Sequence, residues 1–211
     1  MNILALETSR PEASLCLRLG AACPVTCRWQ ALRNHDAFLF PALQQALEAL
    51  GEQPLDLILV GAGPGSYGGV RVALAAAVGL SLVRQASVVA LPSWLQLTAD
   101  GTSVFSDAKR GGWTLQQPGC ELRVISLDEL RELARQSAPL GSVESADTVA
   151  ALDLPGSVRC AISPTAEGLI NSWETLSPEQ QAAYAARPAE PIYVRPPHIT
   201  EAKHKPWELR G

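Results

Sequence analysis

The first thirty residues show the two-residue alternation of apolar and polar side chains that is typical of strands. Residues 3–6 form an apolar run, residues 13–19 alternate, and residues 25–29 form a third strand-like segment. Glu7-Thr8-Ser9-Arg10-Pro11 reads as a turn between the first two, and Gly20 ends the second. The pattern predicts an antiparallel meander of three strands.

The period then changes to the three and four residues of a helix. Apolar side chains recur at positions 38, 39, 42, 43, 46, 47 and 50, after the N-cap candidates Asn34 and Asp36. Gly51 ends this stripe, and Pro41 predicts either a kink or the first turn of the helix. The segment is therefore expected to be one amphipathic helix.

A parallel crossover is predicted next. Residues 57–60 are an apolar run typical of a strand buried on both faces, and a glycine-rich turn leads into a helix from about residue 69 to residue 84. Residues 87–91 form another short apolar strand. Strand, helix and strand in this order form a right-handed unit with parallel strands.

The second half has weaker patterns. Strands are expected at 103–105, 113–116 and 158–162, a short helix at 127–136, a helix after Pro164, and a tail punctuated by prolines. No internal repeat is visible. A shift in composition near Asp100 predicts a complete first domain at 1–100 and a reduced second domain at 101–211.

Composition restricts the class of protein. Of 211 residues, 47% are hydrophobic and 18% are charged, which suits a buried core and excludes a disordered chain. The net charge of −4 argues against a protein that grips a nucleic-acid backbone unaided. The five cysteines form no Cys-x-x-Cys pair and are expected to be reduced. With no signal-peptide pattern, and with the apolar run 72–83 too short to span a bilayer, we expect a cytoplasmic protein without a membrane span.

The glycine turn at 61–69 is the densest chemical signal. Backbone N–H groups at a helix N-terminus can hold a phosphate, so Gly63, Gly65 and Ser66 are candidate phosphate-loop residues. The lysine of a P-loop is missing, because Gly69 and Val70 occupy its place and that of the following hydroxyl residue. A Gly-x-Gly-x-x-Gly spacing is present, but residues 57–99 contain no acid to hold a ribose. A tight strand-to-helix connection remains the simpler alternative.

Other candidate groups are sparse. Thr8 and Ser9 could serve a phosphate or Mg²⁺, or could satisfy the backbone of their own turn. The three histidines form no His-Glu-x-x-His pattern, so no metal site is predicted. A serine-hydrolase elbow at Ser66 fails because Pro64 replaces its first glycine, and no catalytic residue is assigned.

The helix at 69–84 carries no charge between Arg71 and Arg84 and is apolar nearly all round, which predicts burial on several sides. Either the domain core or a partner protein would cover it, and both alternatives stay open. The candidate partner-interface residues are Phe38, Leu39, Leu43 and Leu47 on the first helix, and Val70, Leu74 and Val78 on the second.

Four segments, in this order along the chain, resemble the TsaB (YeaZ) family. Residues 1–9 (Met-Asn-Ile-Leu-Ala-Leu-Glu-Thr-Ser) look like its opening strand and turn, usually written with Asp-Thr-Ser. Residues 63–71 look like its Gly-Pro-Gly-Ser-Phe-Thr-Gly-Leu-Arg signature, 107–111 like its Asp-Ala-Arg-Arg turn, and 191–196 like its closing Pro-x-Tyr-Leu-Arg segment. Glu7, Gly68 and Val78 depart from the family pattern, where Asp, a hydroxyl residue and often Lys stand.

The resemblance implies an α/β fold of the actin-like ATPase (ribonuclease H-like, sugar-kinase-like) class. It implies a non-catalytic partner of the threonylcarbamoyl transferase TsaD in forming N6-threonylcarbamoyladenosine in transfer RNA, in a complex with the small ATPase TsaE. The metal-binding histidine pair of the catalytic paralogue is missing here, since Leu39 stands four residues after His35. The resemblance implies no required cofactor, although ATP or ADP at an interface of the complex stays open. It leaves a homodimer as an alternative assembly, and it implies contact with transfer RNA only as part of the complex.

Two other functions stay open. The wider family is labelled glycoprotease-like and its fold also hosts sugar kinases, so a peptidase or a kinase is one alternative. A purely structural adaptor with other partners is another, because a fold does not fix a function.

Overall fold

A computed structural model describes residues 1–31, 34–136 and 139–194 of the chain. Its first domain contains a five-stranded sheet in the order β3-β2-β1-β4-β5. The elements of this domain are β1 (Asn2–Glu7), β2 (Glu12–Leu19), β3 (Val25–Gln30), α1 (His35–Leu50), β4 (Leu57–Gly61), α2 (Tyr67–Arg84) and β5 (Ser87–Leu91). The first three strands are antiparallel, and β4 and β5 run parallel to β1. The predicted meander and crossover are therefore confirmed.

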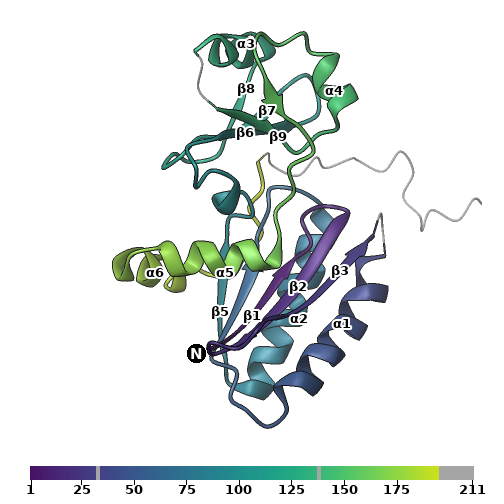
Figure 1. The fold of residues 1–211 in the computed structure, drawn as a ribbon, viewed down its shortest axis with the longest axis vertical. Helices are drawn as coiled ribbons and strands as arrows, with labels where there is room; N and C mark the ends of the chain where they lie inside the picture. The colour runs from purple at the N-terminus through teal and green to yellow at the C-terminus, as the bar shows by residue number, and fades with distance from the viewer. Residues whose placement is uncertain (32–33, 137–138, 195–211) are drawn as a thin grey trace, which may run out of the picture.

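Helices cover both faces of this sheet (Figure 1). The alternation along β1 sends Leu4 and Leu6 into a core shared with α1 and α2. Ile3 and Ala5 face the opposite side, where they meet α5 (Ala166–Thr175). The sheet is thus the middle layer of three, and its central strands are buried on both faces.

The second domain holds a smaller five-stranded sheet in the order β10-β9-β6-β7-β8. Its elements are β6 (Ser103–Asp107), β7 (Trp113–Gln116), β8 (Arg123–Ile125), α3 (Leu127–Arg135), β9 (Leu140–Ser142), α4 (Ala146–Ala150) and β10 (Val158–Arg159). The core of this domain lies between the sheet and its helices, around Phe105, Leu115 and Leu130. The strand expected at 158–162 is shorter than predicted, and β8, β9 and α4 were not predicted.

The two sheets have the same topology. From β6 to β10, three antiparallel strands are followed by two parallel ones, as from β1 to β5, and α3 and α4 occupy the places of α1 and α2. No repeat was visible in the sequence because the elements of the second copy are much shorter: α4 has 5 residues where α2 has 18. The fold is the actin-like α/β class with a complete first domain and a reduced second one.

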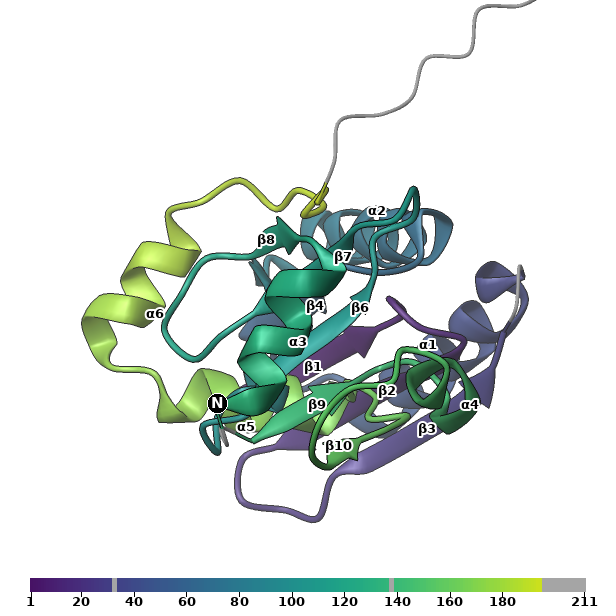
Figure 2. The same cartoon turned by 90° about the horizontal axis from the view of Figure 1, so that it is seen from above.

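The domain boundary expected at residue 100 requires a correction. After β10 the chain returns to the first domain, where Leu169, Ile170 and Trp173 of α5 join the core under β1, β4 and β5. Helix α6 (Pro178–Ala185) also lies against β5. Residues 166–185 therefore belong to the first domain, because their apolar side chains cover the sheet face that α1 and α2 leave open. The two domains are stacked along the long axis of the molecule (Figures 1 and 2).

Helix α2 is less buried than its composition predicts. Val70, Ala73, Leu74 and Ala77 lie in the core, but Leu82 is 79% exposed. At 18 residues, α2 is also longer than its apolar run, and in the described part of the chain it is the one helix that could cross a membrane by length and composition alone. A core helix of an α/β layer passes the same test, and the packing of its inner face against the sheet accounts for the apolar residues there.

Candidate functional site in the interdomain cleft

Three of the segments singled out in the sequence meet at a cavity of about 380 Å³ between the two domains. The glycine turn contributes residues 62–67, the β6–β7 turn contributes 106–109, and the chain near its C-terminus contributes 191–194. Arg10 from the β1–β2 turn, Val70 of α2, Thr114 of β7 and Glu144 after β9 complete the lining. The closing segment is held by the Ile192 N–H, which donates to the carbonyl of Ala62 at 2.8 Å. Residues 195 and 196 of that motif lie outside the described residues.

The polar groups of the two candidate phosphate loops are hydrogen-bonded to each other. Thr8 Oγ1 donates to the carbonyl of Gly69 at 2.8 Å, and the Ser66 N–H donates to the carbonyl of Ser9 at 2.6 Å. The Ser66 hydroxyl accepts from the Gly69 N–H and caps α2. A Cβ at Gly65 would lie 2.1 Å from the Ser9 carbonyl oxygen, so only glycine permits this contact.

These contacts tie the β1–β2 turn to the start of α2. Gly63 also belongs to this frame, since its N–H donates to Ser93 Oγ at 3.1 Å. The hydroxyl of Ser9 is enclosed and has no partner among the described residues. The candidate residues are therefore brought together, with Thr8 and Ser66 engaged in structural contacts. Nucleotide binding by these loops stays a prediction.

Glu7 is a fully buried carboxyl group behind this frame. Its Oε1 accepts from the Ser9 N–H at 2.8 Å, whereas Oε2 has no partner among the described residues. Burial raises the pKa of Glu7 above its ordinary 4.5, and the polar groups of the neighbouring Ser9 and Ser93 offset only part of this effect. Burial therefore disfavours the charged form of this carboxyl group.

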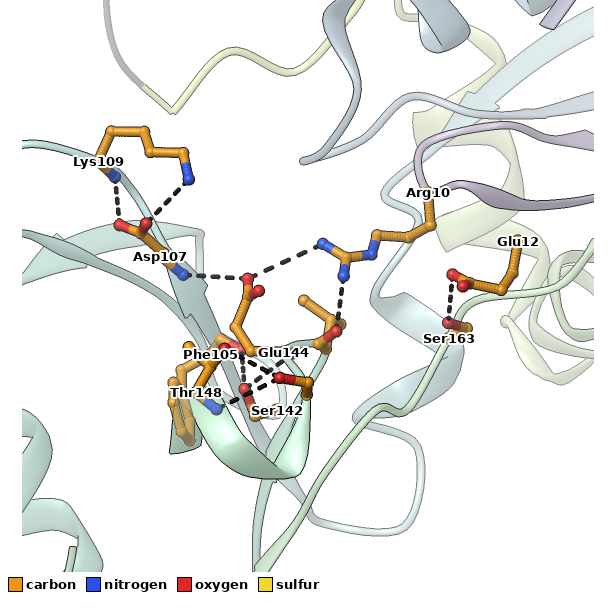
Figure 3. Close-up of polar contacts among 11 residues, drawn as sticks. Arg10, Glu12, Phe105, Asp107, Lys109, Ser142, Glu144, Thr148 and Ser163 are labelled. Atoms are coloured by element: carbon orange, nitrogen blue, oxygen red, sulfur yellow. Dashed lines mark hydrogen bonds and ion pairs between the residues drawn. The ribbon is translucent and has the colours of Figure 1, made fainter. Parts of the chain in front are cut away.

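Arg10 bridges the two domains across the cleft (Figure 3). Its Nη2 donates to the carbonyl of Val143 at 2.7 Å, and its Nη1 lies 3.8 Å from Glu144 Oε1. The same carboxylate oxygen accepts from the Asp107 N–H at 3.3 Å. Asp107 in turn pairs with Lys109 at 2.9 Å, and this hydrogen bond is the main cause of the raised pKa of Lys109. A chain of polar contacts thus connects the β1–β2 turn, β9 and the β6–β7 turn.

Arg10 also separates the first cavity from a second one of about 800 Å³ between the same domains. Across this second cavity, Ser163 Oγ donates to Glu12 Oε2 at 3.5 Å, as Figure 3 shows. Sequence reasoning missed Arg10 and Glu144, because nothing in the sequence indicates that residues 134 positions apart would meet.

The candidate partner-interface residues divide into two groups. Phe38 and Val78 are 47% and 44% exposed, and Leu47 is half-buried. The others are buried in the core between the helices and the sheet: Leu39, Leu43, Val70 and Leu74. Their assignment to a partner surface is corrected for this reason, with Leu43 alone also lining a groove on the outside.

That groove lies between α1 and α2 and has a volume of about 540 Å³. Phe40 and Leu43 line it from α1, and small or apolar residues line it from α2 (Val72, Ala75, Ala76, Gly79 and Leu80). Leu82 and Val83 extend the same apolar character toward the end of α2, where they are 79% and 78% exposed. The lack of charge between residues 71 and 84 was the signal that indicated this surface.

No metal site can be built from the described residues, since no three His, Cys, Asp or Glu side chains come together there. The side chain of His35 and the whole of His198 and His204 lie outside the described residues. The prediction that the protein needs no metal stays a prediction.

Two stacked domains of like topology, joined by a cleft whose walls are the β1–β2 and β6–β7 turns, define a protein of the actin-like class. The structure of YeaZ from Pseudomonas aeruginosa superposes with a TM-score of 0.67 over 91% of this chain and 100% of that one, at 21% identity. A second structure, an uncharacterized protein with similarity to peptidase YeaZ from the same organism, gives 0.70 over 92% and 99%, at 20% identity. The chain therefore has the fold of YeaZ.

Comparisons at the level of sequence are narrower. Residues 29–106 match the family model of TsaD, the tRNA N6-adenosine threonylcarbamoyltransferase. Among curated protein sequences none matches. The TsaD match and the YeaZ fold together support the assignment to the TsaB (YeaZ) family that the four motifs predicted.

Proposed function

We propose that this protein acts in the formation of N6-threonylcarbamoyladenosine in transfer RNA, as a non-catalytic partner of a TsaD-type transferase. In this proposal the outer face of α1 and α2 binds the partner, and a TsaE-type ATPase joins the resulting complex. The protein contacts transfer RNA only as part of this complex, in keeping with its net charge of −4. ATP or ADP would lie at an interface of the assembly.

The match to the TsaD family model supports the placement in this system. It covers residues 29–106, which include α1, β4, α2 and β5. This is the crossover unit whose helices form the groove, so the part of the chain most similar to TsaD is also the part that presents the apolar surface.

The apolar groove is the observation that carries the proposal. Phe40, Leu82 and Val83 are each more than half exposed, and the groove between α1 and α2 is lined by apolar residues with Asp36 as its one acid. Exposed apolar surface of this kind marks a binding face, and a paired helical surface suits another helical surface. Burial contributes about 25 cal/mol per Å² before the costs of association.

Arrangements in the cleft support a non-catalytic role. The charged groups that line it pair with one another, as Arg10 does with Glu144 and Lys109 with Asp107. Glu7, the one buried carboxyl group in the described part of the chain, lies behind the loops and does not line the cavity. In this proposal the paired charges of the cleft connect the two domains and take no part in a reaction.

The test is binding to a TsaD-type transferase, with one matched pair of variants. Phe40 on α1 and Val124 on β8 are both exposed apolar residues, at 56% and 38%, so a glutamate at either position is tolerated in the isolated chain. Phe40→Glu places a charge in the groove of the proposed interface, and we expect its dissociation constant to rise at least tenfold. Val124→Glu should bind as the unchanged protein does.

Isothermal titration with the purified transferase measures both constants. Equal affinities for the two variants would refute the α1–α2 surface. Binding by neither variant, with both folded, would place the interface elsewhere or show a global effect of the added charge.

A further inference from the structure

A third cavity, of about 370 Å³, lies on the other side of the domain junction from Arg10. It is formed by the β7–β8 connection, the start of the interdomain linker, helix α6 and the segment near residue 192. Most of its wall is apolar, with Pro64, Leu95, Leu122 and Ile192 among the lining residues. A volume of this size and an apolar wall are typical of small-molecule sites.

One polar side chain in this wall, that of Gln116, has a buried oxygen without a hydrogen-bond partner among the described residues. Gln116, at the end of β7, lines the cavity and is only 8% exposed. Its carbonyl oxygen Oε1 is enclosed and has no hydrogen-bond partner among the described residues. A buried carbonyl oxygen without a partner costs free energy that the fold does not recover, so this group favours a ligand that donates a hydrogen bond to it.

The carboxamide also specifies what that chemistry is. It presents a carbonyl acceptor and an N–H donor side by side, and it pairs with a ligand edge that offers a donor next to an acceptor. The pairing edges of nucleobases have this arrangement. A planar base would lie against the apolar wall, where the ring of Tyr184 also lines the cavity.

The charged residues of the lining are Arg187 and Glu121, which carry opposite charges. Arg187 lines the cavity, is exposed, and lies with its guanidinium carbon 5.0 Å from the centre of the Tyr184 ring. It has no acidic partner among the described residues. From this geometry we infer that the cavity is a nucleobase site in which Gln116 recognises the base and the Tyr184 ring, with Arg187 beside it, forms part of the wall. The inference does not rest on the proposed partner or on the glycine turn.

Two probes distinguish a free nucleotide from a base within single-stranded RNA. Ligand-observed NMR with uridine monophosphate tests a free nucleotide, and a four-residue oligouridylate tests a base within single-stranded RNA. Saturation transfer from the protein to the uracil protons of either probe is expected for the unchanged chain. Transfer to neither probe would overturn the inference.

Variants connect the signal to Gln116. Gln116→Leu keeps the volume and removes both hydrogen-bonding groups, while Gln116→Glu keeps the shape and leaves acceptors only, so each should weaken binding at least tenfold. Gln117→Leu changes the adjacent glutamine, which does not line the cavity, and should bind as the unchanged protein does. Thermal unfolding of each variant confirms that it is folded. Binding that survives both changes at Gln116 would contradict the site.

Discussion

The close approach of Gly61 to Glu7 predicts how a substitution at Gly61 changes stability. Gly61 ends β4, and a Cβ built there would lie 2.0 Å from Glu7 Oε2 and 2.7 Å from Ser93 Oγ. Neither neighbour can move far, because Glu7 and Ser93 are both fully buried. Gly61→Ala should therefore destabilise the protein even though alanine is the smallest possible addition.

The magnitude follows from the cost of adding atoms to a packed core. Such overpacking costs about 1–3 kcal/mol, and in a domain of this size about 1 kcal/mol lowers the Tm by roughly 2–4 °C. We expect a fall in Tm of roughly 2 to 12 °C, with the free energy of unfolding reduced by about 1–3 kcal/mol in a urea titration.

A double-mutant cycle and a control isolate the cause. Glu7→Asp shortens the carboxyl side chain, so Gly61→Ala should cost at least about 1 kcal/mol less in that background than in the unchanged chain. Gly68→Ala is the matched change at a site where nothing lies within 4 Å of the added Cβ. It should raise the free energy of unfolding by about 0.4–1 kcal/mol. A Tm of Gly61→Ala within a degree or so of the unchanged protein, or a cost that Glu7→Asp leaves untouched, would refute the reasoning.

Two further predictions concern the buried carboxyl group of Glu7 and the contact of Arg10 between the domains. The raised pKa of Glu7 means that the folded state holds a proton which the unfolded state releases above about pH 4.5, so stability falls as the pH rises toward the folded pKa. Glu7→Gln should remove this fall in stability with pH, measured by urea titrations at several pH values. Above the folded pKa of Glu7, the variant should have a free energy of unfolding higher by about 1.4 kcal/mol for each unit by which that pKa is raised. The same dependence on pH in the variant and the unchanged protein would contradict a raised pKa of Glu7. Arg10→Met removes the bond to Val143 and the pair with Glu144, and should speed hydrogen exchange around residues 142–144, whereas Arg28→Met, at a 65% exposed side chain, should not. Equal exchange in the two arginine variants would show that Arg10 does not hold the domains together.

Local patterns predicted most of the first domain because its elements are long and regular. The alternation along residues 13–19 and the stripe along 38–50 repeat often enough to determine both the type and the face of each element. In the second domain β9 has three residues and α4 has five, which is too short for either period to show. The return of α5 to the first sheet depends on a tertiary contact that no local pattern encodes.

The site was predicted as a set of segments and not as a geometry. The glycine turn and the Asp107 turn were identified and do meet at one cavity. The lack of a partner for the Gln116 side chain, by contrast, depends on what surrounds it in space, and the sequence carries no signal of it. The sequence also left open whether the core or a partner covers α2, because an apolar helix has the same pattern whether its outer face is covered or exposed.

The most direct test of the proposed function is the mass of the assembly in solution. Multi-angle light scattering is measured on this chain alone, on a TsaD-type transferase from the same organism alone, and on their mixture at micromolar concentration, with the Phe40→Glu and Val124→Glu variants in parallel. The account predicts a defined heteromer that forms with Val124→Glu and is lost with Phe40→Glu. A mixture that elutes as its separate components, also after nucleotide and a TsaE-type ATPase are added, would contradict it.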